Sequence, residues 1–405
     1  MRAIAKVSSL VVLGLLGASA ALACATADNE GSTGEPPPTP LDAGNEAEAS
    51  SAVEPDASPD AGPCSSSGLC KVDVPIDGQI NVMSISGSGR ADVWAVGTNR
   101  SVLHYDGTTW VKSAPISSGG TPYTLRSVYV ASDKDIWVTD GPMLRHTTGW
   151  KGPSATEWTS FGPEGADDGA VPLALGGKDG RVFIARQVPV RVDHPPVRFP
   201  PRLLVCRGWG DKGPVDPELG VPGTTLFKVD GLMSVSASRA NEVWVINMPL
   251  SDRSERSLPF DLNSNRVMRA SYGADQTWRD EEFDTRMTRN LFGVWANEDV
   301  VWLAGEGGGV RRMTRERMDT RVFEVVPSPV TTTLRAVFGF SADDVWAVGD
   351  AATVIHWDGT TWTKLTTPFD SESVKPKLLS IWGSGPKDVW IGGRGTMLHF
   401  EGVAR

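Results

Sequence analysis

One unit recurs along this chain after residue 70, and it limits the possible folds more than any other feature. The stretch "SVLHYDGTTW" at 101–110 returns as "TVIHWDGTTW" at 353–362. Each full copy also carries Asp-Val-Trp or a close variant upstream of this stretch. The central tryptophans are Trp94, Trp137, Trp244, Trp302, Trp346 and Trp390. A degenerate copy around "RVFIA" (181–185), with Phe183 in place of tryptophan, fills the longest gap and makes seven copies.

Short apolar runs within each copy predict β-strands. They are rich in Val, Ile and Trp and are separated by Gly, Asp, Ser and Pro, and no helical period is sustained. The Asp-Gly pair at 106–107 is a strong hairpin signal, because glycine adopts positive φ at no steric cost. About four strands per unit, repeated seven times, predict an all-β, seven-bladed β-propeller of four-stranded antiparallel blades over 71–405.

The two ends of the repeat region predict how the ring closes. The last copy stops after its third strand, at "MLHFEG" (397–402). The segment "CKVDVPI" (70–76) has the alternation of a strand without a partner in its own unit. We expect it to supply the fourth strand of the last blade, because an open terminal sheet would expose an unpaired edge.

Several polar side chains recur at one repeat position each. Equivalent positions of different blades lie far apart around a ring, so these residues are predicted to be structural and not a shared metal or catalytic site. The histidines are His104, His146, His356 and His399. The acids before the tryptophans, which we expect to bond backbone N–H groups of the preceding turn, are Asp92, Asp135, Asp344 and Asp388, with Glu242 as a variant.

Small residues and aromatic residues alternate in the first strand of the unit. The small ones suit innermost strands that crowd near the axis, and they are Ser84, Ser127, Ser234, Gly293, Ala336 and Ser380. Two residues later stand Tyr129, Trp295, Phe338 and Trp382. We interpret these aromatics as wedges between blades; the alternative is a stacking platform for sugars at the channel mouth.

The N-terminal segment differs from the rest in composition. Residues 1–23 have two bases, an apolar run and small residues, which is the layout of an export signal. Residues 24–70 consist largely of small and acidic residues with Pro, and are predicted to form a disordered tether. Of the net charge of −10, the body beyond residue 63 carries only 40 acids against 37 bases. A near-neutral body argues against a nucleic-acid partner.

The blade motifs resemble those of exported bacterial propellers with Asp-box, kelch-like (BNR-type) repeats. The residues that carry the likeness are "DVWAVG" (92–97 and 344–349), "DVWIGG" (388–393), "HYDGTTW" and "HWDGTTW". The run Ala21-Leu22-Ala23-Cys24 is similar to a bacterial lipoprotein signal, which implies a lipid on Cys24. This resemblance implies an outer-membrane lipoprotein that meets the membrane only through its lipid. The alternative is cleavage after Ala23 and secretion.

The search for reaction chemistry in the sequence leads to no catalytic residue, metal site or cofactor. Sialidase-type propellers need a tyrosine nucleophile, an acid and an arginine cluster, and the available tyrosines are Tyr105, Tyr123, Tyr129 and Tyr272. The spacing singles out no pair of carboxylates for glycoside hydrolysis. A glycan-active hydrolase or lyase of sialidase-like architecture remains the alternative to a binding module.

The cysteines beyond residue 24 allow two pairings. Export implies an oxidising compartment. "CSSSGLC" suggests a Cys64–Cys70 disulfide with Cys206 unpaired, and the alternative pairs Cys206 with one of the two.

Insertions break the third and fourth copies, at 186–202, 208–223 and 248–266. Rigid scaffolds often place binding residues on such loops, and neutral drift in exposed loops is the alternative. The candidate binding residues there are Arg198, Trp209, Arg253, Arg256 and Arg266. Together these features predict a monomeric, non-enzymatic module that binds a protein or a cell-surface glycan at one propeller face.

Overall fold

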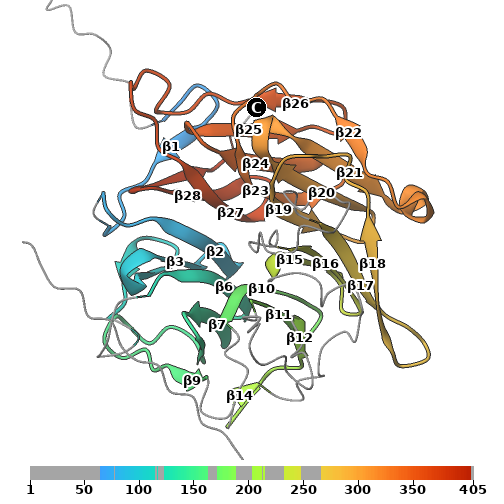
Figure 1. The fold of residues 1–405 in the computed structure, drawn as a ribbon. Helices are drawn as coiled ribbons and strands as arrows, with labels where there is room; N and C mark the ends of the chain where they lie inside the picture. The colour runs from blue at the N-terminus through green and yellow to red at the C-terminus, as the bar shows by residue number, and fades with distance from the viewer. Residues whose placement is uncertain are drawn as a thin grey trace, which may run out of the picture. The chain divides into compact units, whose positions relative to one another are not determined.

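Short antiparallel strands dominate the computed structural model of the protein (Figure 1). The structure describes residues 64–76, 78–114, 116, 123–162, 171–187, 203–211, 213–214, 232–247 and 266–402. Three single-turn or short 3₁₀ segments interrupt the strands in this part of the chain: η1 (Thr98–Arg100), η3 (Glu306–Gly308) and η4 (Arg315–Thr320). No described helix has the length and apolar character needed to cross a membrane.

The strands group into blades in chain order. Blade 1 holds β2 (Val82–Gly89), β3 (Asp92–Gly97), β4 (Val102–Tyr105) and β5 (Trp110–Lys112); blade 2 holds β6 (Leu125–Ser132), β7 (Asp135–Asp140), β8 (Met143–Thr147) and β9 (Thr159–Phe161). Blade 3 holds β10 (Val171–Lys178), β11 (Arg181–Gln187) and β12 (Leu203–Cys206); blade 4 holds β15 (Leu232–Arg239), β16 (Glu242–Asn247), β17 (Val267–Tyr272) and β18 (Trp278–Phe283).

The remaining blades follow the same order. Blade 5 holds β19 (Leu291–Ala296), β20 (Val300–Gly305), β21 (Val310–Thr314) and β22 (Glu324–Val326); blade 6 holds β23 (Leu334–Ser341), β24 (Asp344–Gly349), β25 (Thr353–Trp357) and β26 (Trp362–Lys364). Blade 7 holds β27 (Leu378–Gly385), β28 (Asp388–Gly393), β29 (Thr396–Phe400) and β1 (Leu69–Lys71). A short hairpin, β13 (Trp209–Gly210) with β14 (Gly213–Pro214), follows blade 3, whose described residues form three strands and not four.

The ring closes between the two ends of the repeat region. The first strand of every blade contacts the first strand of the next, and β27 of the last blade contacts β2 of the first. In Figure 1 the blue β1 lies beside the red strands of blade 7, and it pairs antiparallel with β29 through Leu69 and Phe400. The pairing covers Leu69–Lys71, the Val72 amide still donates to the Met397 carbonyl, and Val74 packs in the seam between blades 7 and 1. The closing strand is thus β1, at Leu69–Lys71.

The hydrophobic core consists of seven seams, one between each pair of neighbouring blades. The central aromatic residue of a blade's second strand is nearly or fully buried and packs into the next blade. Trp94 of blade 1 packs with Leu125 and Ile136 of blade 2, and Trp390 of blade 7 packs with Val82 of blade 1. Each seam therefore depends on one large ring from the preceding blade, which explains why the tryptophans recur at this position. The protein is an all-β, seven-bladed propeller.

Candidate binding face

A β-bulge interrupts the innermost strand of every blade near its start. In blade 1, Val82 pairs with Gly97 and Ser84 pairs with Val96, so Met83 is left as the extra residue. The same shift occurs in the other six blades. A bulge re-aims a side chain away from the ladder. The extra residues, which we call the bulge ring, are Met83, Arg126, Leu173, Met233, Phe292, Arg335 and Leu379.

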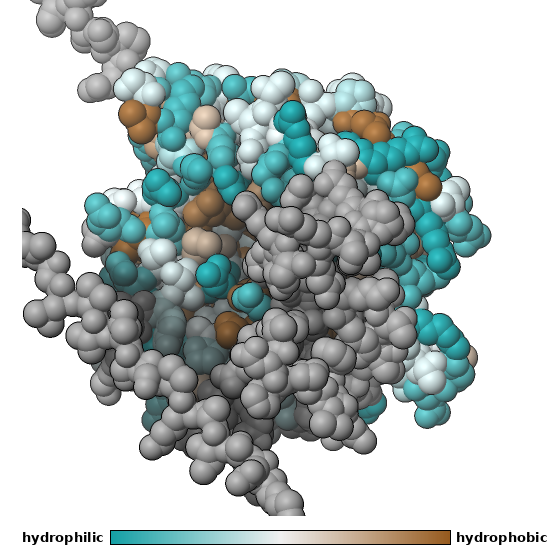
Figure 2. All heavy atoms as spheres, in the orientation of Figure 1, coloured by the Kyte–Doolittle hydropathy of each residue, from teal (hydrophilic) through white to brown (hydrophobic). Residues whose placement is uncertain are grey.

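Five of the seven bulge-ring residues, all but Arg126 and Leu173, line a central cavity of about 230 Å³. None of the seven residues is buried, although the positions before and after them mostly are. Apart from Arg335 and four serines, the cavity lining is apolar. Figure 2 shows hydrophobic residues in the hollowed part of the displayed face. Five of the seven bulge-ring side chains are apolar, and four of these five line the cavity.

The small residues beside the bulges tie neighbouring inner strands together. Ser84 Oγ accepts a hydrogen bond from the Val128 amide at 3.2 Å, and Ser127 Oγ accepts one from the Leu175 amide at 3.0 Å. Ser380 Oγ donates to the Val82 carbonyl at 3.3 Å across the closing seam. A Cβ on Gly293 would lie 3.0 Å from the Val337 amide nitrogen. Small residues are needed here because inner strands approach closely.

The two arginines of the bulge ring differ in their environment. Arg335 forms a bidentate pair with Asp350 through two contacts of 2.8 Å, and its guanidinium lies 4.8 Å from the Phe292 ring centroid. The hydrogen bonds from Arg335 hold the pKa of Asp350 below its usual value, although partial burial opposes this shift. Arg126 is exposed, and its guanidinium forms no ion pair with the residues that the structure describes. Arg126 is thus available to an anionic group.

A groove of about 600 Å³ lies between 71–78 and the connection from blade 6 to blade 7. Lys71 pairs with Glu372 at 2.7 Å, and its ammonium lies 4.3 Å from the Phe369 ring centroid. Arg394 also lines this groove. Val374 at the rim of this groove is 82% exposed.

The four predicted channel aromatics lie between blades. The Tyr129 ring of blade 2 lies so close to Gly177 of blade 3 that a Cβ on this glycine would be 2.4 Å from the ring. Trp295 of blade 5 lies over Gly339 of blade 6 in the same way, with a corresponding distance of 2.8 Å. Trp382 packs in the same way over Gly87 of blade 1, whereas Phe338 contacts Phe340 with ring centroids 5.3 Å apart. Burial raises the pKa of Tyr129 to about 12. Sequence reasoning missed the bulge ring, and the only sequence signal for it was the large residue before each small one.

The predicted loop residues are only partly within the described chain. Arg198, Arg253 and Arg256 lie outside the described residues, as does Cys24. Trp209 stacks on His146 with ring centroids 4.8 Å apart and packs edge-on against Trp137, so it belongs to the blade 2–3 seam. Arg266 pairs with Glu282 at 3.2 Å on blade 4.

The cysteines follow the first of the two pairings. Cys64 and Cys70 form a disulfide, and Cys206 is free and buried. Burial raises the pKa of the Cys206 thiol to about 12. The bridged loop also contacts the connection before blade 7, because Ser66 Oγ lies 2.8 Å from Thr366 Oγ1.

The recurrent acids have a different role from the expected one. Asp92 Oδ1 accepts from Trp94 Nε1 at 2.9 Å and lies 2.8 Å from His104 Nε2, so it bonds side chains and not turn amides. The same contacts recur in blades 2 and 6. Burial opposes the charge of Asp92, yet its hydrogen bonds to His104 and Ser88 lower its pKa overall. Each recurrent histidine bonds the acid of its own blade, and His146 also packs at the blade 2–3 seam, so these residues are structural.

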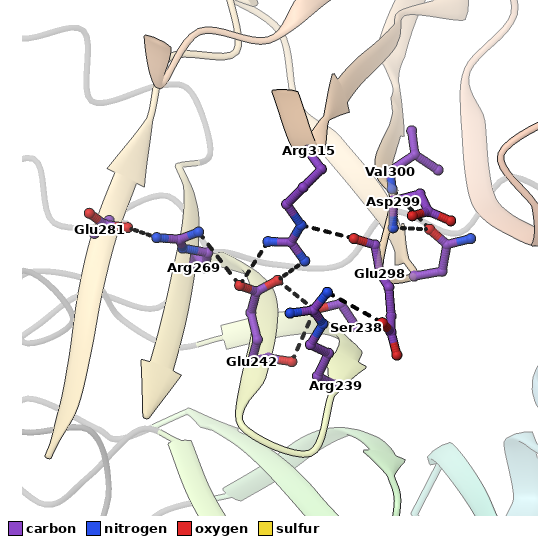
Figure 3. A network of polar contacts seen from close by, with 10 residues as sticks. Ser238, Arg239, Glu242, Arg269, Glu281, Glu298, Asp299, Val300 and Arg315 are labelled. Atoms are coloured by element: carbon purple, nitrogen blue, oxygen red, sulfur yellow. Dashed lines mark hydrogen bonds and ion pairs between the residues drawn. The ribbon is translucent and has the colours of Figure 1, made fainter. Parts of the chain in front are cut away.

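Blade 4 replaces this arrangement with an ion-pair network (Figure 3). Glu242 stands in the acid position, and Arg269 faces Trp244 where blades 1, 2, 6 and 7 have histidine. Glu242 accepts from Arg315 of the next blade at 3.0 and 3.2 Å and lies 3.5 Å from Arg269. Arg269 also contacts Glu281. Burial opposes ionisation of Glu242, but the hydrogen bonds from Arg315 and Ser238 outweigh it and lower the pKa.

Within the described ranges, no group of three or more His, Cys, Asp or Glu side chains is placed to hold a metal ion.

Several solved structures share this fold. The sequence itself matches no family model and none of the curated proteins. It is similar to the structure of YCF48 bound to D1 peptide, at 16% identity and a TM-score of 0.57, covering 83% of this chain and 97% of that one. It is also similar to the WD40 β-propeller domain of Doa1, at 11% identity and a TM-score of 0.54, covering 82% of this chain and 96% of that one. The similarity to a streptogramin B lyase structure has 13% identity and a TM-score of 0.53, and covers 82% of this chain and 96% of that one. At such low identities the likeness shows the propeller class and no activity.

Proposed function

We propose that the chain is an exported, lipid-anchored, non-enzymatic binding module that takes up a segment of a partner polypeptide at the bulge ring. The bulge that recurs in all seven inner strands carries this proposal. It directs mostly apolar side chains to one face of a rigid ring. Binding sites are commonly apolar hollows with a few polar groups that fix orientation.

The chemistry of the ring favours a polypeptide over a glycan. Phe292 is the aromatic member of the ring, and Arg335 already lies over its face. Sugars usually need a free aromatic face, whereas Met83, Met233 and Leu379 suit aliphatic side chains. Arg126 can pair with a carboxylate of the same segment. A similar propeller, YCF48, has been solved with a peptide bound, which agrees with this mode of use.

The anchor rests on Cys24 and the preceding small residues. Replacement by Cys24→Ala removes the acyl acceptor, so the protein should move from the membrane fraction to the soluble fraction. Mass spectrometry of the mature N-terminus should find a diacylglyceryl group on Cys24 in the wild type. An unmodified N-terminus would instead support a secreted protein and remove the anchor from the proposal.

Partner capture tests the binding role. Envelope extract is cross-linked to the wild type and to the double variant Met83→Gln/Leu379→Gln, which makes two apolar bulge-ring residues polar. The control is Val325→Gln, which makes the same change at a residue that is 51% exposed on β22. The double variant should retain about one tenth or less of the captured partner, because a few apolar anchors usually carry most of the binding energy. The control should retain all of it.

The captured species decides between the alternatives. A protein lost only with the double variant supports the proposal, and equal capture by both variants contradicts it. Capture of a glycan, or turnover of envelope glycans by the wild type, would support the rival view of a glycan-binding or glycan-active propeller.

A further inference from the structure

A second pocket, of about 460 Å³, lies at the seam where blade 7 meets blade 1. Its lining includes Tyr105, Trp110, Trp390 and His399, with Asp73 and Thr108. The two tryptophans and the histidine are buried, whereas Asp73 and Thr108 are exposed. The pocket therefore has an aromatic floor and a polar rim.

Three aromatic rings of the floor contact one another. The Tyr105 and Trp390 ring centroids are 4.9 Å apart, and those of Trp110 and Trp390 are 5.1 Å apart with an interplanar angle of 82°. Tyr105 and Trp110 face each other across β4 and β5 at 5.4 Å. Such a group of rings presents electron-rich faces, which attract cations within about 6 Å.

The seam between blades 5 and 6 contains the same three aromatic positions, and an arginine of blade 5 lies over two of these rings. Trp357, Trp362 and Trp302 correspond to Tyr105, Trp110 and Trp390, with centroid distances of 5.1 Å (Trp302–Trp357) and 5.2 Å (Trp302–Trp362). There the guanidinium carbon of Arg312 lies 5.7 Å from the Trp302 centroid and 5.5 Å from the Trp357 centroid. Glu324 pairs with Arg312 at 3.0 Å.

The closing seam has no arginine of its own at this position. Arg312 faces Trp302 in the register of blade 5, and His399 faces Trp390 in the register of blade 7. His399 stacks flat on Trp390, with centroids 3.7 Å apart, and bonds Asp388 at 2.7 Å. His399 thus takes the register position of Arg312, and its buried ring forms part of the pocket lining beside Tyr105 and Trp110.

The surroundings of the pocket are negatively charged. Asp73 forms no ion pair with a residue in the described part of the chain. Burial raises the pKa of Tyr105, and the charges of Glu401, Asp388 and Asp106 raise it further, while Arg90 acts in the opposite direction. A cation entering the pocket would therefore meet aromatic faces and a net negative field.

We propose that this seam pocket is a binding site for an arginine side chain of a partner polypeptide. The guanidinium lies over the Tyr105 and Trp110 rings beside the Asp73 carboxylate. Arg312 makes a related contact on the same chain, over Trp302 and Trp357 beside Glu324. Arginine suits the site better than lysine, because the planar guanidinium stacks on rings and pairs with a carboxylate at the same time. A neutral sugar would use the rings but would gain nothing from the acids.

Titration with two small probes tests the site on the full mature protein. N-acetyl-arginine amide should bind saturably and shift the indole N–H resonances of Trp110 and Trp390. The neutral isostere N-acetyl-citrulline amide should bind at least about tenfold more weakly. Asp73→Asn should weaken arginine binding about three- to tenfold. Asp133→Asn, which removes an exposed acid of blade 2, is the matched control and should leave it unchanged.

A pair of substitutions tests the role of the Tyr105 aromatic ring. Tyr105→Leu should abolish measurable binding and Tyr105→Phe should keep it, and thermal melting of both verifies that the seam still folds. Equal binding of both probes, or binding indifferent to Asp73→Asn and Tyr105→Leu, would overturn the proposal. The bulge-ring double variant should bind the arginine probe normally, so this site and the proposed binding face can fail separately.

Discussion

In blades 1, 2 and 6 the recurrent Asp, His and Trp side chains form one bonded group, which holds the second and third strands together. In blade 6, Asp344 accepts from Trp346 Nε1 at 3.0 Å and lies 2.8 Å from His356 Nε2. The indole and the imidazole also contact each other, with centroids 4.5 Å apart. Because the acid serves both partners, its loss leaves two polar groups without their bond.

We therefore expect Asp344→Ala to lower the free energy of unfolding by about 1–3 kcal/mol. The control is Asp343→Ala, the adjacent exposed acid, which should change it by no more than about 0.5 kcal/mol. Chemical denaturation of both variants measures the difference. Equal effects would mean that the bonded group adds nothing beyond a surface charge.

The Asp-Gly-Thr-Thr turns make the stability of the folded protein depend on pH, again through a single residue. Asp358 Oδ1 accepts from the amides of Thr360 and Thr361 at 2.9 and 2.8 Å, and these bonds with the Thr360 hydroxyl lower the pKa of Asp358 to about 2. Since the folded pKa lies below that of an unfolded Asp, about 3.9, the stabilisation is complete above pH 4. It is lost as the pH falls through about 2.

The melting temperature of Asp358→Ala should accordingly fall below that of the wild type at pH 5, and the gap should close between pH 4 and pH 2. Scanning calorimetry over this range measures it. A gap that stays constant with pH would show that the carboxylate charge is not what holds the turn.

At the scale of the strand, the close approach of inner strands decides which residues fit. The Trp382 ring of blade 7 packs on Gly87 of blade 1, where a Cβ would lie 2.7 Å from the ring and 2.5 Å from the Asp92 carbonyl oxygen. Gly89 lies in the same strand and has nothing within 4 Å of its added Cβ. Comparing substitutions at Gly87 and Gly89 therefore distinguishes the effect of a steric clash from the general effect of replacing glycine in this strand.

Gly87→Ala should destabilise the protein by about 1–3 kcal/mol through overpacking at the closing seam. Gly89→Ala should be neutral or slightly stabilising, because it restricts the unfolded chain without a clash. Urea unfolding of the two variants gives the comparison. Similar midpoints for both would mean that the Trp382 ring moves aside at little cost.

At the scale of the whole molecule, β1 completes a ring that would otherwise have a free edge. Its three residues pair with β29 and bury Leu69 completely, and the Cys64–Cys70 disulfide lies next to it. Unpaired strand edges recruit other chains. We therefore expect β1 to prevent self-association of the protein as well as to stabilise its fold.

A mature chain shortened to begin at Val72 should lose about 1.5–3 kcal/mol from the exposure of the Leu69 site, and should self-associate at its open β29 edge. A chain that begins at Ser58 keeps β1 and is the control. Light scattering after gel filtration measures association, and denaturation measures stability. A monomeric Val72 chain as stable as the control would show that blade 7 closes without β1.

The sequence alone determined the number of blades, the four-strand plan and the places of the seven central aromatic residues, because turns and strand alternation are local and repeat with the unit. It also indicated where small residues must stand. It did not reveal the bulge ring, the Glu242–Arg315 pair or the contrast between Arg312 and His399. Those depend on which residues meet across a seam, and the partners can be distant: Ser380 and Val82 are 298 residues apart. Only the closed ring brings them together, so only the tertiary structure decided them.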